Sequence, residues 1–178
     1  MAELRSALAA QRRAVEEFLA DARAVPAARW TQPRLPGKWS PGQVTEHLAL
    51  AYEANRGVLH GRAPMTAPRL LRPLIRWFGL APVLRRGRFI PGSKSPKAFR
   101  PGDSPAPQAE LLRRLQAATQ AFESDAAAAR SPTLDHPFFG RLPLTDFVRL
   151  QEIHTNHHRG QLAPASSSQP AGAPRAAG

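Results

Sequence analysis

Cysteine is absent from the 178 residues of this chain. Its absence excludes a disulfide framework, a thiolate metal site and a thiol nucleophile carried by the protein itself. Any thiol chemistry must therefore use a thiol that enters from solution.

The sequence also lacks a long uninterrupted apolar run. The longest such stretch, residues 70–84, is broken by two arginines and two prolines, so it is too short and too polar to span a bilayer. The first thirteen residues mix four charged side chains with small ones and contain no secretory apolar segment. We therefore expect a cytoplasmic protein with no transmembrane segment.

Acidic residues are missing from one long interval, because no Asp or Glu occurs between Glu53 and Asp103. The formal charge of the whole chain is +12, and this interval supplies most of it. Its eleven basic residues are Arg56, Arg62, Arg69, Arg72, Arg76, Arg85, Arg86, Arg88, Lys94, Lys97 and Arg100. Such a charge directs attention to nucleic acid, anionic lipid and acidic small molecules as partners.

Four segments have apolar residues at helical spacing. They are residues 2–24, a segment that starts at Ser40, residues 104–129 and residues 143–162. Ser40, Pro41 and Gln43 supply an N-cap, a proline at the first helical position and a capping-box glutamine. The loop of residues 130–142 separates the last two segments, and no alternating strand pattern is present. These features indicate an all-α fold, a four-helix bundle.

A long crossover, residues 62–103, joins the second and third of these helices. Its seven prolines allow only short helical pieces, of which residues 70–84 are the best candidate. We interpret this basic crossover as an insertion within one bundle domain, residues 1–162. Residues 163–178 are mostly Ala, Pro, Ser, Gly and Gln, and we expect a disordered tail there.

Three of the six histidines lie on the inward faces of two predicted helices. His154 and His158 are one turn apart on the fourth helix, and His47 lies in the middle of the inward face of the second. An i, i+4 pair of imidazoles can direct two nitrogens to one metal ion, with His47 as the third ligand. Three such ligands leave a divalent ion open positions for water or substrate. The alternative is a set of hydrogen-bonded core histidines without a metal.

Other polar residues lie near these histidines in the sequence. His157 is about 60° around the helix from His154 and is a weaker ligand candidate, or a group that supports the ligands. Asn156 and Gln161 are candidates to support the ligands or to contact substrate, and an exposed helix surface is the alternative for both. His60 and His136 fall in predicted loops, where we expect them to be solvated.

Taken together, these residues resemble sequence blocks of DinB-like proteins of the YfiT type, which are metal-dependent hydrolases. The blocks are Trp39-Ser40-Pro41, Glu46-His47-Leu48, the segment from His136 to Leu142, and the terminal segment from His154 to Leu162. The resemblance extends over about residues 3–162. It implies a four-helix bundle in which His47, His154 and His158 bind a divalent metal, zinc or nickel.

The resemblance also implies a reaction type. Members of this superfamily include S-transferases and isomerases that activate a low-molecular-weight thiol, such as bacillithiol or mycothiol, at the metal. An exogenous thiol would suit a chain that has no cysteine of its own.

The residues around the predicted ligands favour thiol transfer over hydrolysis. A bound divalent ion lowers the pKa of water to about 7 or deprotonates a thiol, so the catalytic group would be the activated water or thiol. Glu46 and Glu152 point away from the ligand directions on their helices, which leaves water without a carboxylate base. We therefore predict a metal-dependent S-transferase acting on a small-molecule substrate, with a metal-dependent hydrolase as the alternative.

The arginine-rich crossover raises functions of other classes. Arg85, Arg86 and Arg88 are candidates to bind an anionic substrate through their guanidinium groups, and a solvated loop is the alternative. A basic module that binds nucleic acid or a membrane surface, or an interaction bundle without metal, are further alternatives. In the basic module, the segment from Arg69 to Arg88, with Trp77, Phe78 and Leu80 interleaved, would contact the nucleic acid or the acidic membrane, but its prolines disfavour a long amphipathic helix for either. Nucleic acid is not an expected partner, whereas a homodimer is compatible with the sequence.

Overall fold

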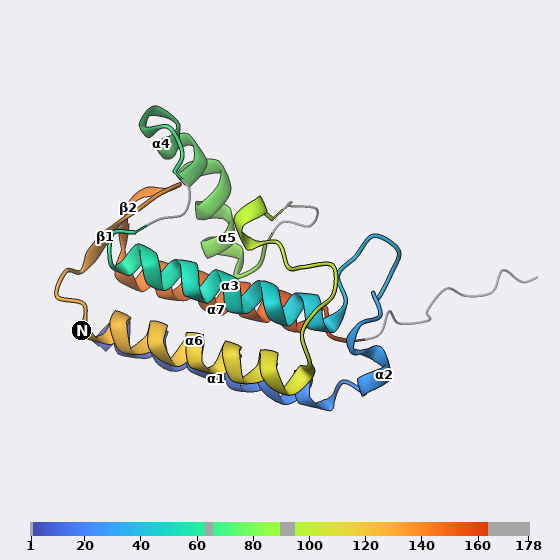
Figure 1. Cartoon of the computed structure of the whole chain (residues 1–178). Helices are drawn as coiled ribbons and strands as arrows, with labels where there is room; N and C mark the ends of the chain where they lie inside the picture. Colours follow the sequence, from blue (N-terminus) through green and yellow to red (C-terminus); the bar gives the residue numbers. More distant parts are fainter. Residues whose placement is uncertain (1, 63–65, 90–94, 164–178) are drawn as a thin grey trace, which may run out of the picture.

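Four long helices form the body of the molecule in the computed structural model, which describes residues 2–62, 66–89 and 95–163. They are α1 (Ala2–Ala24), α3 (Pro41–Leu59), α6 (Gln108–Ala128) and α7 (Leu144–Arg159). α1 packs against α7 and α6, and α3 packs against α6 and α7, so that the four lie side by side in Figure 1. The predicted four-helix bundle is therefore confirmed. The tail predicted to be disordered lies, beyond residue 163, outside the described residues.

The apolar faces predicted from helical spacing form the core. Phe18, Leu48, Phe122 and Phe147, one from each long helix, are fully buried in a single cluster. No described helix has both the length and the apolar character needed to cross a membrane.

The start of α3 follows its predicted capping pattern. The Gln43 backbone N–H donates to Ser40 Oγ at 3.3 Å, and the Ser40 backbone N–H donates to Gln43 Oε1 at 3.0 Å. A short helix, α2 (Ala27–Trp30), precedes it, and the Trp30 indole N–H donates to the carbonyl of Ala106. These contacts fix where α3 begins and so determine the position of His47 along the helix.

A buried polar chain sets the register of α1, α3 and α7. Gln11 Nε2 donates to the Tyr52 hydroxyl at 3.0 Å, and that hydroxyl is 2.9 Å from Thr155 Oγ1. Because desolvation disfavours a phenolate, the pKa of Tyr52 is raised to about 12 and its proton stays in place. Thr155 is the neighbour of His154, so this chain also positions the histidines of α7.

The predicted start of the third long helix was wrong by four residues. Helix α6 begins at Gln108, after Pro107 as N-cap, and not at Ser104. The reason is that a proline restricts the residue before it to extended conformations, and Pro105 and Pro107 restrict Ser104 and Ala106 in turn.

The loop predicted at residues 130–142 was also wrong in part. The strands β1 (Thr133–His136) and β2 (Gly140–Pro143) form an antiparallel hairpin there, with Leu134 paired to Leu142 and His136 to Gly140. The three residues between the strands are followed by Gly140 at φ +67°, which is the left-handed position that closes a three-residue hairpin turn.

The basic crossover contains a nearly continuous helix. We use "crossover helix" for residues 69–86, which comprise η1 (Arg69–Leu71), α4 (Arg72–Ile75), the π-helical η2 (Arg76–Leu80) and α5 (Ala81–Arg86). Pro82 has no N–H and would clash with the carbonyl four residues before it in a regular helix. The wide π turn lies where that clash would fall, so the helix continues through the proline. A second short helix, η3 (Lys97–Phe99), packs against α3.

Candidate metal centre

Two helices bring the three predicted histidines together. His154 and His158 are on one face of α7, and His47 faces them from α3. The His154 Nε2 atom is 3.2 Å from His47 Nε2 and 3.0 Å from His158 Nε2. His47 and His158 are buried, and His154 is half-buried. Among the described residues this is the group of side chains whose ligand atoms lie close enough to hold a metal ion.

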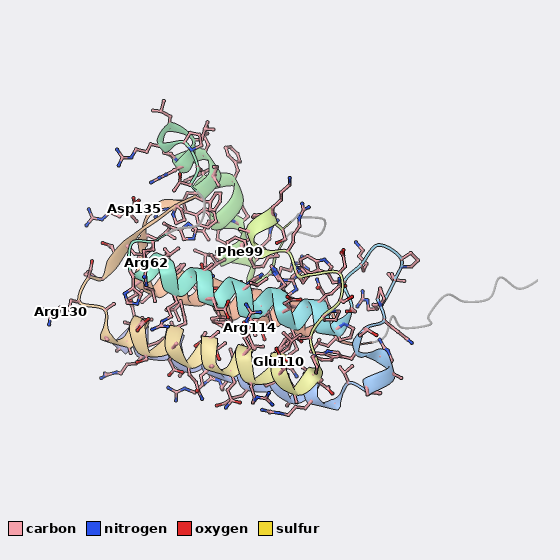
Figure 2. The ribbon with its side chains drawn as sticks, in the orientation of Figure 1. Arg62, Phe99, Glu110, Arg114, Arg130 and Asp135 are labelled. Carbon is pink, nitrogen blue, oxygen red and sulfur yellow. The ribbon has the colours of Figure 1, made fainter. Side chains whose placement is uncertain are left out.

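Hydrogen bonds on the outer side of two rings determine where their protons lie. His47 Nδ1 is 2.6 Å from the carbonyl oxygen of Phe99, which can only accept, so Nδ1 carries the proton. His158 Nδ1 donates in the same way to Gln161 Oε1 at 2.9 Å. Figure 2 shows Phe99 on the short η3 segment beside α3. In neutral rings, both Nε2 atoms therefore present lone pairs toward His154.

This arrangement has more acceptors than donors. The single Nε2 of His154 can donate its proton to one of the two facing lone pairs, and the other lone pair is left opposed to a nitrogen. A cation among the three nitrogens would satisfy all of them at once. The arrangement can therefore hold a metal ion, and without one the three rings cannot all be paired through these nitrogens at once.

Burial keeps these imidazoles neutral. Desolvation is the largest cause of a lowered pKa at all three: it brings the pKa of His158 to about 3, places that of His154 well below 6.5, and lowers that of His47 despite the Phe99 hydrogen bond. The mutual repulsion of the rings acts in the same direction. Since a metal binds the neutral imidazole, protons compete weakly here at neutral pH.

Aromatic rings form two walls of the cluster. The Trp39 ring centroid is 4.8 Å from that of His47 and 6.3 Å from that of His158. Phe89, which follows the crossover helix, lies 5.4 Å from His154 and 5.6 Å from His157. These walls limit the access of water to the three nitrogens.

The residues predicted to support the ligands occupy different environments. Gln161 bridges two imidazoles, because its Oε1 accepts from His158 and its Nε2 contacts His157 Nε2 at 3.1 Å. His157 is half-buried and packs against His158. Asn156 is exposed on α7.

The prediction that His136 is solvated was wrong. His136 is 6% exposed, stacks on Phe139 at 4.5 Å, and accepts at Nδ1 from the backbone N–H groups of Phe138 and Phe139. Desolvation lowers its pKa to about 4. His60 is exposed as expected, and its Nε2 lies 2.7 Å from Asp125 Oδ2.

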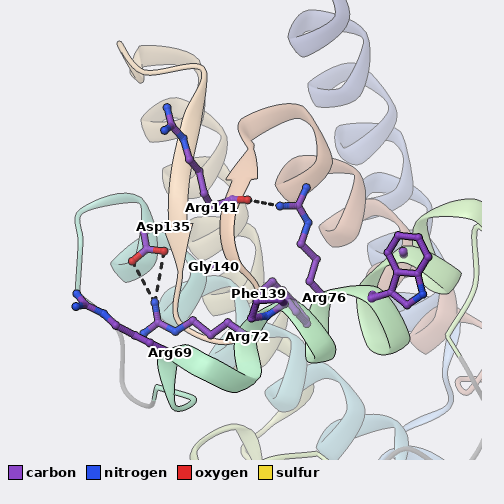
Figure 3. Close-up of a pocket in the computed structure, with 10 residues that line it drawn as sticks. Arg69, Arg72, Arg76, Asp135, Phe139, Gly140 and Arg141 are labelled. Carbon is purple, nitrogen blue, oxygen red and sulfur yellow. Dashed lines mark hydrogen bonds and ion pairs between the residues drawn. The ribbon is translucent and has the colours of Figure 1, made fainter.

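Basic residues of the crossover line a cleft that is separate from the histidines. This arginine cleft has a volume of about 640 Å³ and lies between the crossover helix and the hairpin (Figure 3). Its guanidinium groups belong to Arg69, Arg72 and Arg76, which lie in the predicted basic crossover, and to Arg141, which the sequence did not single out. The predicted anion-binding residues Arg85 and Arg86, at the end of α5, and Arg88, which follows it, are exposed. They do not line the arginine cleft, so their role stays a prediction.

Sequence reasoning missed the groups that position the cluster from outside the long helices. The carbonyl of Phe99 is a backbone atom 52 residues from His47, and a backbone carbonyl has no residue-type signature. Phe89 lay inside a segment predicted only as broken helix. Trp39 had a signal, since it begins the Trp-Ser-Pro block before α3.

Fold and site define a four-helix-bundle protein with a buried three-histidine cluster of a kind that can hold a metal ion. The chain belongs to the family described as "Protein of unknown function (DUF1569)", whose model matches residues 11–165 and so includes all three histidines.

A solved structure has a similar fold. The crystal structure of TT2238, described as a four-helix bundle protein, matches with a TM-score of 0.57 and 24% sequence identity. The match covers 89% of this chain and 97% of that one. A comparison with curated proteins gave no match.

Proposed function

We propose that His47, His154 and His158 bind one divalent ion, zinc or nickel, and that the protein uses it to activate a low-molecular-weight thiol for transfer to an electrophilic small molecule. The observation that carries the metal is the convergence of three Nε2 atoms, two of which hold lone pairs inward. Neutral nitrogen ligands suit both ions. A divalent ion held there supplies Lewis acidity, which lowers the pKa of a thiol or water at its open positions.

The chain's own residues would orient the ligands and keep the site dry. The Phe99 carbonyl and the Gln161 amide hold His47 and His158 in the tautomer that leaves Nε2 free. Trp39 and Phe89 provide apolar walls, against which the carbon skeleton of a thiol or an electrophile can pack.

Thiol transfer is favoured over hydrolysis by the surroundings of the cluster. In the described residues, no carboxylate belongs to the group of converging ligand atoms. Glu46, next to His47 in the sequence, instead accepts from the backbone N–H of Gly102 at 3.3 Å. A water nucleophile would lack an acidic side chain as base, whereas a thiol ionised at a metal needs none. The blocks shared with DinB-like proteins support the same ligands and the same chemistry.

Metal content tests the site directly. Elemental analysis of the purified untagged protein should find about one divalent ion per chain, because the three ligands converge on one point. Single replacement of His47, His154 or His158 by Ala should remove most of it. The matched control is His60→Ala, which alters an exposed histidine at the C-terminal cap of α3 and should keep the full metal content. A His154→Ala protein with full metal content would contradict the proposal.

The reaction requires a separate assay. The metal-loaded protein is incubated with bacillithiol, mycothiol or glutathione and a chlorodinitrobenzene electrophile, and conjugate formation is followed. His47→Ala protein and metal-stripped wild type serve as controls. Metal-dependent turnover of an ester or amide panel without thiol conjugation would show instead that the hydrolase alternative is correct.

A further inference from the structure

The crossover helix leaves an apolar face in water. Leu70 is 91% exposed, Trp77 72% and Phe78 68%, and Leu71 and Leu74 are about half exposed. Leu70 and Leu74 are four residues apart in the first half of the helix, and the exposed Trp77 and Phe78 follow within the π turn, so the apolar exposure is continuous along the helix. In the described part of the chain, Leu35 is the other large apolar side chain that is exposed. A contiguous apolar face of this kind marks an interaction surface.

The far half of the same helix is anchored. Leu80 and Val83 are buried against Leu142 of the hairpin and Leu150 and Ile153 of α7. The near half, α4, projects away from the bundle in Figure 1. The apolar face is therefore held out from the bundle by a packed support.

The arginine cleft adjoins this face. Trp77 belongs to both, since it also lines the cleft with Arg69, Arg72 and Arg76 of the same helix. Figure 3 shows Arg72 paired with Asp135, and Arg76 donating to the carbonyl of Arg141. Asp135 is the acidic lining residue, so the cleft keeps an excess of positive charge beside the apolar face.

We propose that the crossover helix and the arginine cleft form a docking surface for an anionic lipid bilayer. A helix that presents leucines and aromatics to solvent next to arginines suits the membrane interface, where apolar side chains enter the acyl boundary and guanidinium groups contact lipid phosphates. Both features then have one ligand. The helix lies on the membrane and does not cross it.

Other occupants explain less of the surface. A second copy packed through the apolar face would bring only the same basic surface, so the arginine cleft would have no anionic partner. Nucleic acid would contact the arginines but leave Leu70, Leu74 and Phe78 in water.

Vesicle sedimentation of the full chain tests the proposal. We expect binding to vesicles of phosphatidylglycerol and phosphatidylcholine, and little binding to phosphatidylcholine alone. Tryptophan emission should shift to the blue because Trp77 leaves water, whereas Trp30 and Trp39 are already buried or half-buried. The double variant Leu74→Ser/Trp77→Ser should bind at least about tenfold more weakly, because two buried apolar side chains are lost. Leu35→Ser, which removes an exposed leucine elsewhere, should bind like wild type.

A charge series separates the lipid headgroup from other anions. Arg69→Gln/Arg76→Gln should weaken vesicle binding about thirtyfold, since each arginine near an anionic surface contributes to it. Arg5→Gln/Arg13→Gln, an equal loss of charge on α1, should change it much less. Three results would overturn the proposal: equal binding to neutral and anionic vesicles; displacement from vesicles by millimolar inorganic phosphate, which would indicate a small-anion site; and a dimer in solution that Leu74→Ser/Trp77→Ser dissociates.

Discussion

The histidine cluster and the crossover helix differ in which side chains they expose to solvent. In the cluster, polar imidazoles are withdrawn from water, and a backbone carbonyl and a glutamine amide hold two of them in place. In the crossover helix, leucines and aromatics that could have been buried are instead left in water beside arginines. In both regions the burial is the reverse of what these residue types usually show, because polar side chains are mostly exposed in proteins and large apolar ones mostly buried.

The two regions therefore suit different kinds of ligand. The buried imidazole lone pairs of the cluster suit a small cation that can reach an enclosed site. The exposed apolar face of the crossover helix suits a large partner, such as a membrane surface, that binds without entering a cavity. The two regions are therefore expected to work independently, although Phe89 and α7 connect them physically.

The largest expected effect concerns a buried imidazole outside the cluster. His136 has a pKa of about 4 in the folded chain and about 6.5 when unfolded, so its contribution is complete above pH 6.5 and is lost as the pH falls toward 4. The loss amounts to about 3 kcal/mol of unfolding free energy. His136→Asn retains an acceptor for the Phe138 and Phe139 N–H groups but does not titrate.

Urea denaturation at pH 7.5 and pH 4 measures this effect. The stability of the His136→Asn protein should fall less between the two pH values than that of wild type, by about 3 kcal/mol. Asn156→Ala, at an exposed position without a titratable group, is the control and should retain the wild-type difference. If both variants lose the same amount as wild type, burial of the His136 imidazole does not govern the acid response.

The support of the cluster is the next test. Gln161→Ala should weaken metal binding by about 10–100-fold, because it releases the His158 ring from its fixed tautomer and orientation. Competition with a chromophoric chelator measures the affinity. Asn156→Ala, an exposed position on α7, is the matched control. Equal affinities for the two variants would mean that the Gln161 hydrogen bond does not orient a ligand.

The smallest expected effects are changes in stability when a glycine is replaced by alanine, once at the start of α3 and once in the crossover helix. A Cβ at Gly42, at the start of α3, would lie 2.8 Å from Pro105 Cβ and from Trp30 Nε1, so Gly42→Ala should destabilise the protein by about 1–3 kcal/mol. A Cβ at Gly79 in the crossover helix meets only Ile75 Cγ2, at 3.9 Å, so Gly79→Ala should stabilise it by about 0.5–1 kcal/mol. Urea denaturation of both proteins should give shifts of opposite sign, and shifts of the same sign would contradict the packing difference.

The long helices and the three histidines were predictable because helical periodicity reports which side chains share a face. The capping box of Ser40 and Gln43 was predictable because its residues are local in sequence. The same reasoning failed where structure depends on distant pairing. The strands of the hairpin have four residues each, too few for an alternating pattern, and Gly140 was their one local signal.

The crossover helix was predicted in place, at residues 70–84, but its continuity through Pro82 was not. Its prolines predicted breaks, and the π turn that accommodates Pro82 has no sequence pattern of its own. The burial of His136 depends on the hairpin that folds it against Phe147, so it could not be read from a segment taken for a loop. The exposed leucines and aromatics had equally good apolar spacing for burial, and only the fold shows that nothing in the described chain covers them.

The π turn at Arg76–Leu80 also sets a rotational phase. Each residue of a regular α-helix advances by about 100°, and a π turn takes up one residue more than a regular turn does. Leu80 and Val83 pack against the bundle, so the extra residue rotates the preceding part of the helix, residues 69–75, about its axis relative to these two side chains. Shortening the turn by one residue would rotate Leu70 and Leu74 by about 100° with no change in composition. The direction in which the apolar face points is thus governed by backbone winding several residues away from the side chains that form it.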